Sequence, residues 1–132
     1  MSKLIYLATP YSHTDPEVRE RRFRAVSRCA GWLLCHAEVF PYSPITLGHP
    51  ILAEISHIPG TTFEWHFWAD FDKAMILKCA EFWVYCQEGW RASVGLAAEL
   101  RIVAEHGIPV HYVLDAPDGG YAIMDTPPAF GG

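Results

Sequence analysis

The feature that most constrains the fold is the alternation of short apolar runs with longer amphipathic segments. Four apolar runs follow one another along the chain: Lys3–Ala8, Val39–Tyr42, Glu81–Cys86 and Pro109–Leu114. Each run is short and largely apolar on both faces, which is typical of strands in a parallel sheet that is covered by helices. The sequence therefore predicts an α/β fold.

Three of the intervening segments have the spacing and end signals of helices. Thr14-Asp15-Pro16-Glu17 has the form of a capping box with proline in the first turn, so a helix is predicted from there to about Ala37. A second helix is predicted from Thr61 or Thr62 to Cys79. A third contains Glu99 and ends at Gly107. These elements predict a single-domain Rossmann- or flavodoxin-like parallel sheet of four to five strands with helices on both faces.

Two stretches do not follow this alternation. Residues 44–60 contain three prolines and are predicted to be irregular, with a short helix at Ile51–Ser56. Residues 115–132 are rich in Pro and Gly and are interpreted as a C-terminal tail. The predicted α/β domain therefore covers residues 1–114.

Length and charge limit the class of protein. The 132 residues fit one domain with one core, and a net charge of −5 argues against binding to a nucleic-acid polymer. The four cysteines form no CxxC pair and are interpreted as buried, reduced thiols. No apolar run has the length of a signal peptide core or a membrane span. We expect a soluble cytoplasmic protein that does not bind membranes.

Polar side chains follow the predicted strands at the edge of the sheet where ligands bind in such folds. The carboxyl ends of parallel strands lie at one edge, so the loops after Ala8, Tyr42 and Cys86 should converge on one crevice. The polar residues there are Tyr11, Ser12, His13, Tyr42, Ser43, Glu88, Arg91 and Ser93.

Carboxylates lie on the apolar stripes of two predicted helices. At helical spacing, Glu99 shares a stripe with Leu96 and Val103. Asp72 lies in the middle of a stripe of apolar residues from Trp65 to Cys79, and Asp70 falls on the neighbouring stripe. Burying carboxylates destabilises a protein unless they are paired, so two such acids favour a catalytic site over two helix-edge acids that reach solvent. Paired carboxylates suit bond cleavage at an anomeric carbon.

The helix that carries Glu99 begins with a candidate anion site. Ser93 and Gly95 stand where a loop enters the helix, and free amides and the helix dipole favour an anion there, close to Arg91. Ser93 equally fits a helix N-cap. The chain lacks the phosphate loop GxxxxGK[ST] and the dinucleotide motif GxGxxG, and its histidines lack metal-ligand spacing. No cofactor and no metal are expected.

Four motifs, in order along residues 3–114, carry a resemblance to a known superfamily. They are IYLATPYS, the acid in DFDKAMILKCAEFWVY, SVGLAAE and AEHGIPV. Together they resemble the nucleoside 2-deoxyribosyltransferase superfamily, which includes the 2′-deoxynucleoside 5′-monophosphate N-glycosidases. The resemblance implies a small-molecule nucleoside or nucleotide substrate and a homodimer or higher homo-oligomer.

The resemblance also implies residue roles. Glu99 matches the nucleophile at C1′, and Asp72 or Asp70 matches the acid that handles the leaving base. Tyr11 or Tyr6 matches the tyrosine that orients the glutamate. Three further matches concern substrate binding: Ser93 for a 5′-phosphate, and Glu88 and Trp90 in the loop that faces the base or sugar.

The resulting hypothesis is an N-glycosidic enzyme in which Glu99 attacks C1′ of a (deoxy)nucleoside or nucleotide. Hydrolysis and transfer to a second base are both consistent with the sequence. Two other functions are kept as alternatives: a nucleotide sensor that binds without cleavage, and an assembly protein whose aromatic helix, Trp65–Phe71, forms a contact surface.

Overall fold

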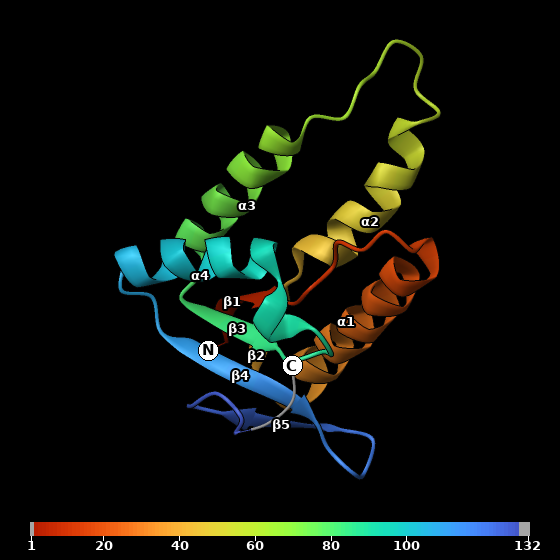
Figure 1. Ribbon diagram of the computed structural model, residues 1–132. Helices are drawn as coiled ribbons and strands as arrows, with labels where there is room; N and C mark the ends of the chain where they lie inside the picture. The colour runs from red at the N-terminus through yellow and green to blue at the C-terminus, as the bar shows by residue number, and fades with distance from the viewer. Residues whose placement is uncertain (1, 130–132) are drawn as a thin grey trace.

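The fold is a five-stranded sheet with helices on both faces (Figure 1). The computed structural model describes residues 2–129. The strands are β1 (Lys3–Ala8), β2 (Val39–Tyr42), β3 (Glu81–Tyr85), β4 (Val110–Asp115) and β5 (Tyr121–Met124). Their order in the sheet is β2-β1-β3-β4-β5; the first four are parallel, and β5 pairs antiparallel with β4. The predicted α/β class is confirmed.

The helices are α1 (Pro16–His36), α2 (Pro44–Ile55), α3 (Trp65–Lys78) and α4 (Val94–Glu105), with a single 3₁₀ turn, η1 (Trp90–Ala92), before α4. The side chain of Asp15 caps α1 by accepting a hydrogen bond from the Glu17 amide at 2.9 Å. The N-cap is thus Asp15, one residue after the Thr14 expected from the capping-box pattern. Gly107 adopts φ +64° just after α4, a left-handed conformation that favours glycine and ends the helix as predicted.

Alternation along β1 divides the core into two layers. Ile5 and Leu7 face α1, where they pack with Val26, Cys29 and Leu33. Tyr6 and Ala8 face the opposite side, where they pack with residues of α3 and α4. Because successive strand residues point to opposite faces, Tyr6 is directed toward the helix that carries Glu99.

Two predictions about local structure are corrected. Residues 44–60 are not mainly irregular, because α2 begins at Pro44. The Ser43 hydroxyl accepts a hydrogen bond from the Thr46 amide at 3.1 Å, and proline is favoured at the first helical position, so these two residues start the helix. The helix tolerates Pro50, which removes one backbone donor. Helix α3 begins at Trp65 and not at Thr61 or Thr62.

The C-terminal region and the cysteines also differ from expectation. The segment interpreted as a tail contributes β5 to the sheet, and residues 130–132 of it lie outside the described residues. A turn at Asp118–Gly119 allows this pairing, since Gly119 adopts φ +87°. The cysteines are free thiols as predicted, but Cys35 is exposed, whereas Cys29 and Cys79 are buried. Within residues 2–129, no helix is long and apolar enough to cross a membrane.

Candidate active site

A cavity of about 720 Å³ lies beyond the carboxyl end of β1. Its wall includes the loop that follows β1 (residues 9–12), the loop that enters α4, and parts of α2, α3 and α4. The loops after β1 and β3 and the start of α2, which follows β2, therefore meet at one crevice, as parallel-sheet topology requires.

Three helices line this cavity with residues at the same spacing. Each contributes residues at i, i+3, i+4 and i+7, so one face of each helix lines the space. The lining residues of this kind are Ile45, Gly48, His49 and Leu52 of α2; Trp65, Trp68, Ala69 and Asp72 of α3; and Gly95, Ala98, Glu99 and Ile102 of α4.

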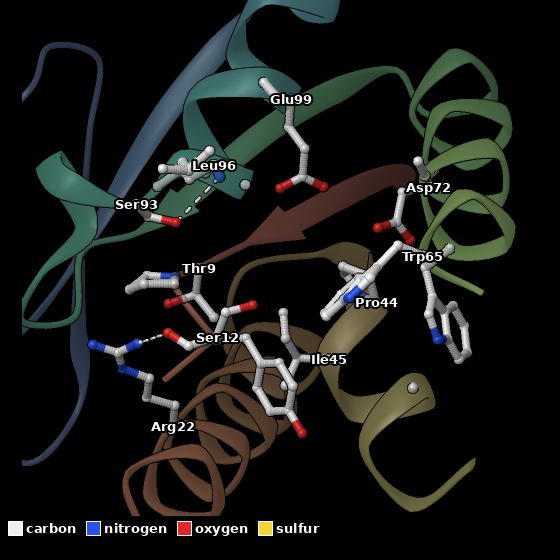
Figure 2. Close-up of a pocket in the computed structure, with 18 of the residues that line it drawn as sticks. Thr9, Ser12, Arg22, Pro44, Ile45, Trp65, Asp72, Ser93, Leu96 and Glu99 are labelled. Atoms are coloured by element: carbon white, nitrogen blue, oxygen red, sulfur yellow. Dashed lines mark hydrogen bonds between the residues drawn. The ribbon is translucent and has the colours of Figure 1, made fainter. Parts of the chain in front are cut away.

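This spacing explains why acids lie on apolar stripes. On α4, Leu96 and Val103 are buried in the core, and Glu99 lies where the core-facing stripe meets the cavity-facing one. On α3, Ile76 and Cys79 pack in the core, whereas Asp72 lies one turn toward the helix start and lines the cavity. Figure 2 shows the carboxyl groups of Glu99 and Asp72 directed into the same space.

Glu99 is held by a tyrosine from the sheet. The fully buried Tyr6 on β1 donates a hydrogen bond from its hydroxyl to Glu99 Oε2. Burial raises the pKa of Glu99 to about 8, with a further contribution from the charge of Asp72, while the Tyr6 hydrogen bond acts in the opposite direction. Of the two tyrosines that the resemblance proposed as partners of the glutamate, Tyr6 is the one in contact.

Asp72 has unsatisfied hydrogen-bonding capacity. Burial raises its pKa to about 6. Within residues 2–129, three buried side-chain atoms lack a hydrogen-bond partner: Asp72 Oδ1, Trp68 Nε1 and Tyr42 Oη. Tyr42 lies near both acids, since the charges of Asp72 and Glu99 add to the effect of burial in raising its pKa to about 12. Buried polar atoms without partners are unfavourable, so this end of the cavity is suited to a polar ligand.

The start of α4 also borders the cavity. Ser93 and Gly95 line it, and the Ser93 hydroxyl accepts a hydrogen bond from the Leu96 amide at 3.2 Å. Ser93 is therefore an N-cap whose hydroxyl hydrogen is still able to donate to a ligand. Ser12 lines the cavity as predicted, and its carbonyl accepts a hydrogen bond from Arg22 Nη1 at 3.1 Å (Figure 2).

Besides Tyr6 and Tyr42, six of the predicted residues do not line the cavity. His13 is exposed, Ser43 is buried and caps α2, and the other four are Asp70, Trp90, Arg91 and Glu88. Asp70 is exposed on α3. Trp90 is buried in the core, 5.9 Å from the Tyr112 ring between centroids. Arg91 stacks on the Trp90 ring at 4.4 Å and donates to the Pro128 carbonyl. Glu88 is exposed, and its carbonyl accepts from Arg22.

Several cavity residues were missed by sequence reasoning. His49 was missed because residues 44–50 were predicted to be irregular, although the Ser43-Pro44 start signal and the spacing of Ile45, Gly48 and Leu52 were present. His49 Nδ1 lies 2.6 Å from the hydroxyl of Tyr11, which also lines the cavity. Arg22 was missed because it lies on α1, which packs on the face of the sheet opposite to α3 and α4.

The first half of α3 carries exposed aromatic side chains. Trp65 is 70% exposed, Phe67 55% and Phe71 41%. Exposed apolar surface of this kind is consistent with an interaction site. The homo-oligomer remains a prediction. Among the described residues, no three His, Cys, Asp or Glu side chains are grouped so that they could hold a metal ion.

The fold and the site together define an α/β protein with a two-carboxylate cavity at the carboxyl edge of a parallel sheet. The chain belongs to the family described as a domain of unknown function, DUF1937, whose model matches residues 3–114. That match spans β1 to β4 and includes every residue that lines the cavity. A search of curated proteins finds no match to the chain.

Proposed function

We propose that this protein cleaves the N-glycosidic bond of a (deoxy)nucleoside or nucleoside 5′-monophosphate, with Glu99 as the nucleophile. The observation that carries the proposal is the pair of acids in one cavity, of which Glu99 accepts a hydrogen bond from Tyr6 and Asp72 has an unpartnered oxygen. The resemblance to the nucleoside 2-deoxyribosyltransferase superfamily supports the same roles for the two acids.

The proposed reaction has two steps. A Glu99 carboxylate oxygen attacks C1′, the bond from C1′ to the base nitrogen breaks, and the Asp72 carboxyl group gives its proton to the departing base. In the second step, water attacks C1′, the bond to Glu99 breaks, and the proton of the water moves to Asp72. A second nucleobase in place of water makes the reaction a transfer. The apolar walls keep bulk water from the developing oxocarbenium ion.

The two raised pKa values keep one proton on the pair of acids near neutral pH. Asp72 and Glu99 titrate at about 6 and about 8, so the pair holds one proton and one negative charge between these values. At these values the proton of the free pair resides on Glu99 and the charge on Asp72. The reaction uses the opposite placement, so the proton moves from Glu99 to Asp72 before the attack, and the Tyr6 hydrogen bond favours the resulting Glu99 carboxylate.

The pH dependence of kcat/KM should therefore be bell-shaped. Below about 6 both acids are protonated and no nucleophile is present; above about 8 both are ionised and no proton is available for the base. We expect the maximum between these limits. Measuring base release across this range checks the prediction, and a rate that rises steadily to high pH contradicts it.

Tyr6→Phe should lower the maximum rate by about 10- to 100-fold, because a charge-assisted hydrogen bond to the nucleophile is lost. The Tyr6 hydrogen bond lowers the pKa of Glu99, so its removal should also move the alkaline limb of the profile to higher pH. Unchanged kinetics with unchanged folding would show that Tyr6 has no part in the reaction. The pH profile of the variant is the measurement.

Chromatography tests the proposed function itself. The protein is incubated with nucleosides and 5′-monophosphates, with and without an added acceptor base, and free or exchanged base is measured. We expect base release from at least one compound, and exchange would identify a transferase. Tight nucleotide binding without release would indicate a sensor instead. An oligomer that neither binds nor cleaves any of these compounds would indicate an assembly protein.

A further inference from the structure

A chain of three hydrogen-bonded side chains joins the cavity wall to the surface of α1. Tyr11 Oη lies 2.6 Å from His49 Nδ1, and His49 Nε2 lies 2.6 Å from Glu20 Oε2. The three residues come from the loop after β1, from α2 and from α1. The two acids Glu99 and Asp72 come from α4 and α3, so this chain belongs to a different wall of the cavity.

The surrounding structure fixes the histidine ring. Phe23 of α1 stacks on it with centroids 4.2 Å apart and an interplanar angle of 22°. The hydroxyls of Ser27 and Thr46 lie 2.8 Å apart and tie α1 to α2 one turn away from His49. Arg24 contacts the other oxygen of Glu20 at 3.0 Å, and hydrogen bonds from Arg24 and His49 lower the pKa of Glu20.

The charge of Glu20 determines the direction of the hydrogen bonds. An ionised carboxylate only accepts, so His49 must donate to it from Nε2. In the neutral imidazole the other nitrogen, Nδ1, is then an acceptor, and Tyr11 must donate its proton to it. Arg19 also lies near this oxygen, because burial raises the pKa of Tyr11 while the charge of Arg19 and a hydrogen bond from it act in the opposite direction. The oxygen has two lone pairs, so one is left for a ligand in the cavity that Tyr11 lines.

We propose that Glu20 and His49 position the Tyr11 hydroxyl as a hydrogen-bond acceptor that recognises a neutral donor on the ligand, a hydroxyl or an amino group. Glu20 and His49 are positioning residues in this scheme, and Tyr11 is the residue that contacts the ligand. The inference rests on the proposed function and adds a recognition point to it.

Binding to a protein that cannot turn over its ligand tests the recognition role. In a Glu99→Gln background, calorimetry measures Kd for the nucleosides and 5′-monophosphates used in the chromatographic panel. Adding Tyr11→Phe should weaken binding by about 5- to 10-fold, the contribution of one neutral hydrogen bond. Adding Tyr121→Phe, which removes a phenol hydroxyl outside the cavity on β5, should leave Kd unchanged. Equal Kd values with and without Tyr11→Phe would overturn the inference.

Two histidine variants separate positioning from general structure. In His49→Asn the side-chain amide lies near the former position of Nδ1, so it can still accept a hydrogen bond from Tyr11. In His49→Gln the amide lies nearer the former position of Nε2, so the contact with Tyr11 is lost. We expect His49→Gln to weaken binding as much as Tyr11→Phe does, and His49→Asn to weaken it less. In the catalytically active protein, these changes should appear in KM with kcat nearly unchanged. The opposite order of the two variants would overturn the positioning role.

Ligand analogues identify the donor by a double-mutant cycle. A nucleoside in which one hydroxyl or amino group is replaced by hydrogen is compared with its parent. The analogue that lacks the donor should bind the Glu99→Gln protein more weakly than its parent does, yet match its parent once Tyr11→Phe is added. A loss of the same size in both proteins for every analogue would show that Tyr11 recognises no such group.

The arrangement is also testable without any ligand, which separates its failure from failure of the proposed function. NMR of ¹⁵N-labelled histidine in the wild-type protein should show the His49 ring protonated at Nε2 and accepting at Nδ1, with the His49 variants identifying the signal. Tyr11→Phe should shift the Nδ1 resonance. A ring protonated only at Nδ1 would overturn the inference. Absence of nucleoside binding together with the expected NMR result would overturn the proposed function, and the recognition role that depends on it.

Discussion

Glu99→Gln is expected to reduce base release by at least about 1,000-fold, because an amide cannot form the bond to C1′ that the carboxylate forms. Gln has nearly the same shape and can still accept the Tyr6 hydrogen bond, so the cavity should be preserved. Affinity for the intact nucleoside should change little. The measurement is the rate of base release under conditions that saturate the wild-type protein.

Two variants serve as controls for this result. Glu105→Gln changes the same residue type at an exposed position of the same helix and should retain full activity. Asp72→Asn should lose about 100- to 10,000-fold, the usual contribution of a general acid. Full activity of Glu99→Gln would disprove the proposed nucleophile. A larger loss in Asp72→Asn than in Glu99→Gln would indicate that the two acids exchange roles.

Glu99→Gln should also stabilise the folded protein at alkaline pH. The pKa of Glu99 is about 8 in the folded protein, against an ordinary value of 4.5 for a glutamate. Because the folded-state pKa is raised, the contribution of Glu99 to stability is fully present below about 4.5 and is lost progressively as the pH rises to about 8. The amide does not ionise, so the variant avoids this loss.

The expected gain near pH 8 is on the order of 2 to 4 kcal/mol in the free energy of unfolding, since one pKa unit corresponds to about 1.4 kcal/mol. At about pH 4, where the carboxyl group is protonated in the folded state and largely so in the unfolded state, the difference should nearly vanish. Urea unfolding at the two pH values measures it, with Glu105→Gln as the control. A variant that is equally or less stable than wild type near pH 8 would show that Glu99 ionises at no cost to the fold.

Periodicity predicted most of the fold because the strands and helices here have strong local signals. Lys3–Ala8 and Val39–Tyr42 coincide with β1 and β2, since each apolar run is long enough for a buried strand and too short for a helix. α2 was largely missed because the three prolines of residues 44–60 were interpreted as helix breakers, whereas Ser43 and Pro44 decide the start. β5 was missed because its stability comes from pairing with β4 and from the turn at Gly119, not from a long apolar run.

The sequence predicted those residues of the candidate site that share one face of a helix. It did not predict the contacts between residues of different elements. Glu99 and Asp72 could be picked out from the sequence alone, because an acidic residue at an otherwise apolar position of a helical repeat is unusual. The partner of Glu99 could only be narrowed to Tyr6 or Tyr11, since the choice depends on where each tyrosine lies relative to the faces of β1. The contact between His49 and Glu20 joins two helices and leaves no periodic signal in either.

The most direct test of the central claim is to locate the sugar on the protein during turnover. The wild-type protein is mixed with a nucleoside that it cleaves, quenched with acid at successive times, digested and analysed by mass spectrometry. The proposed mechanism predicts the added mass of the sugar on the peptide that contains Glu99, and none in Glu99→Gln. Base release with the sugar attached to Asp72, or with no sugar on the protein at any time, would contradict it.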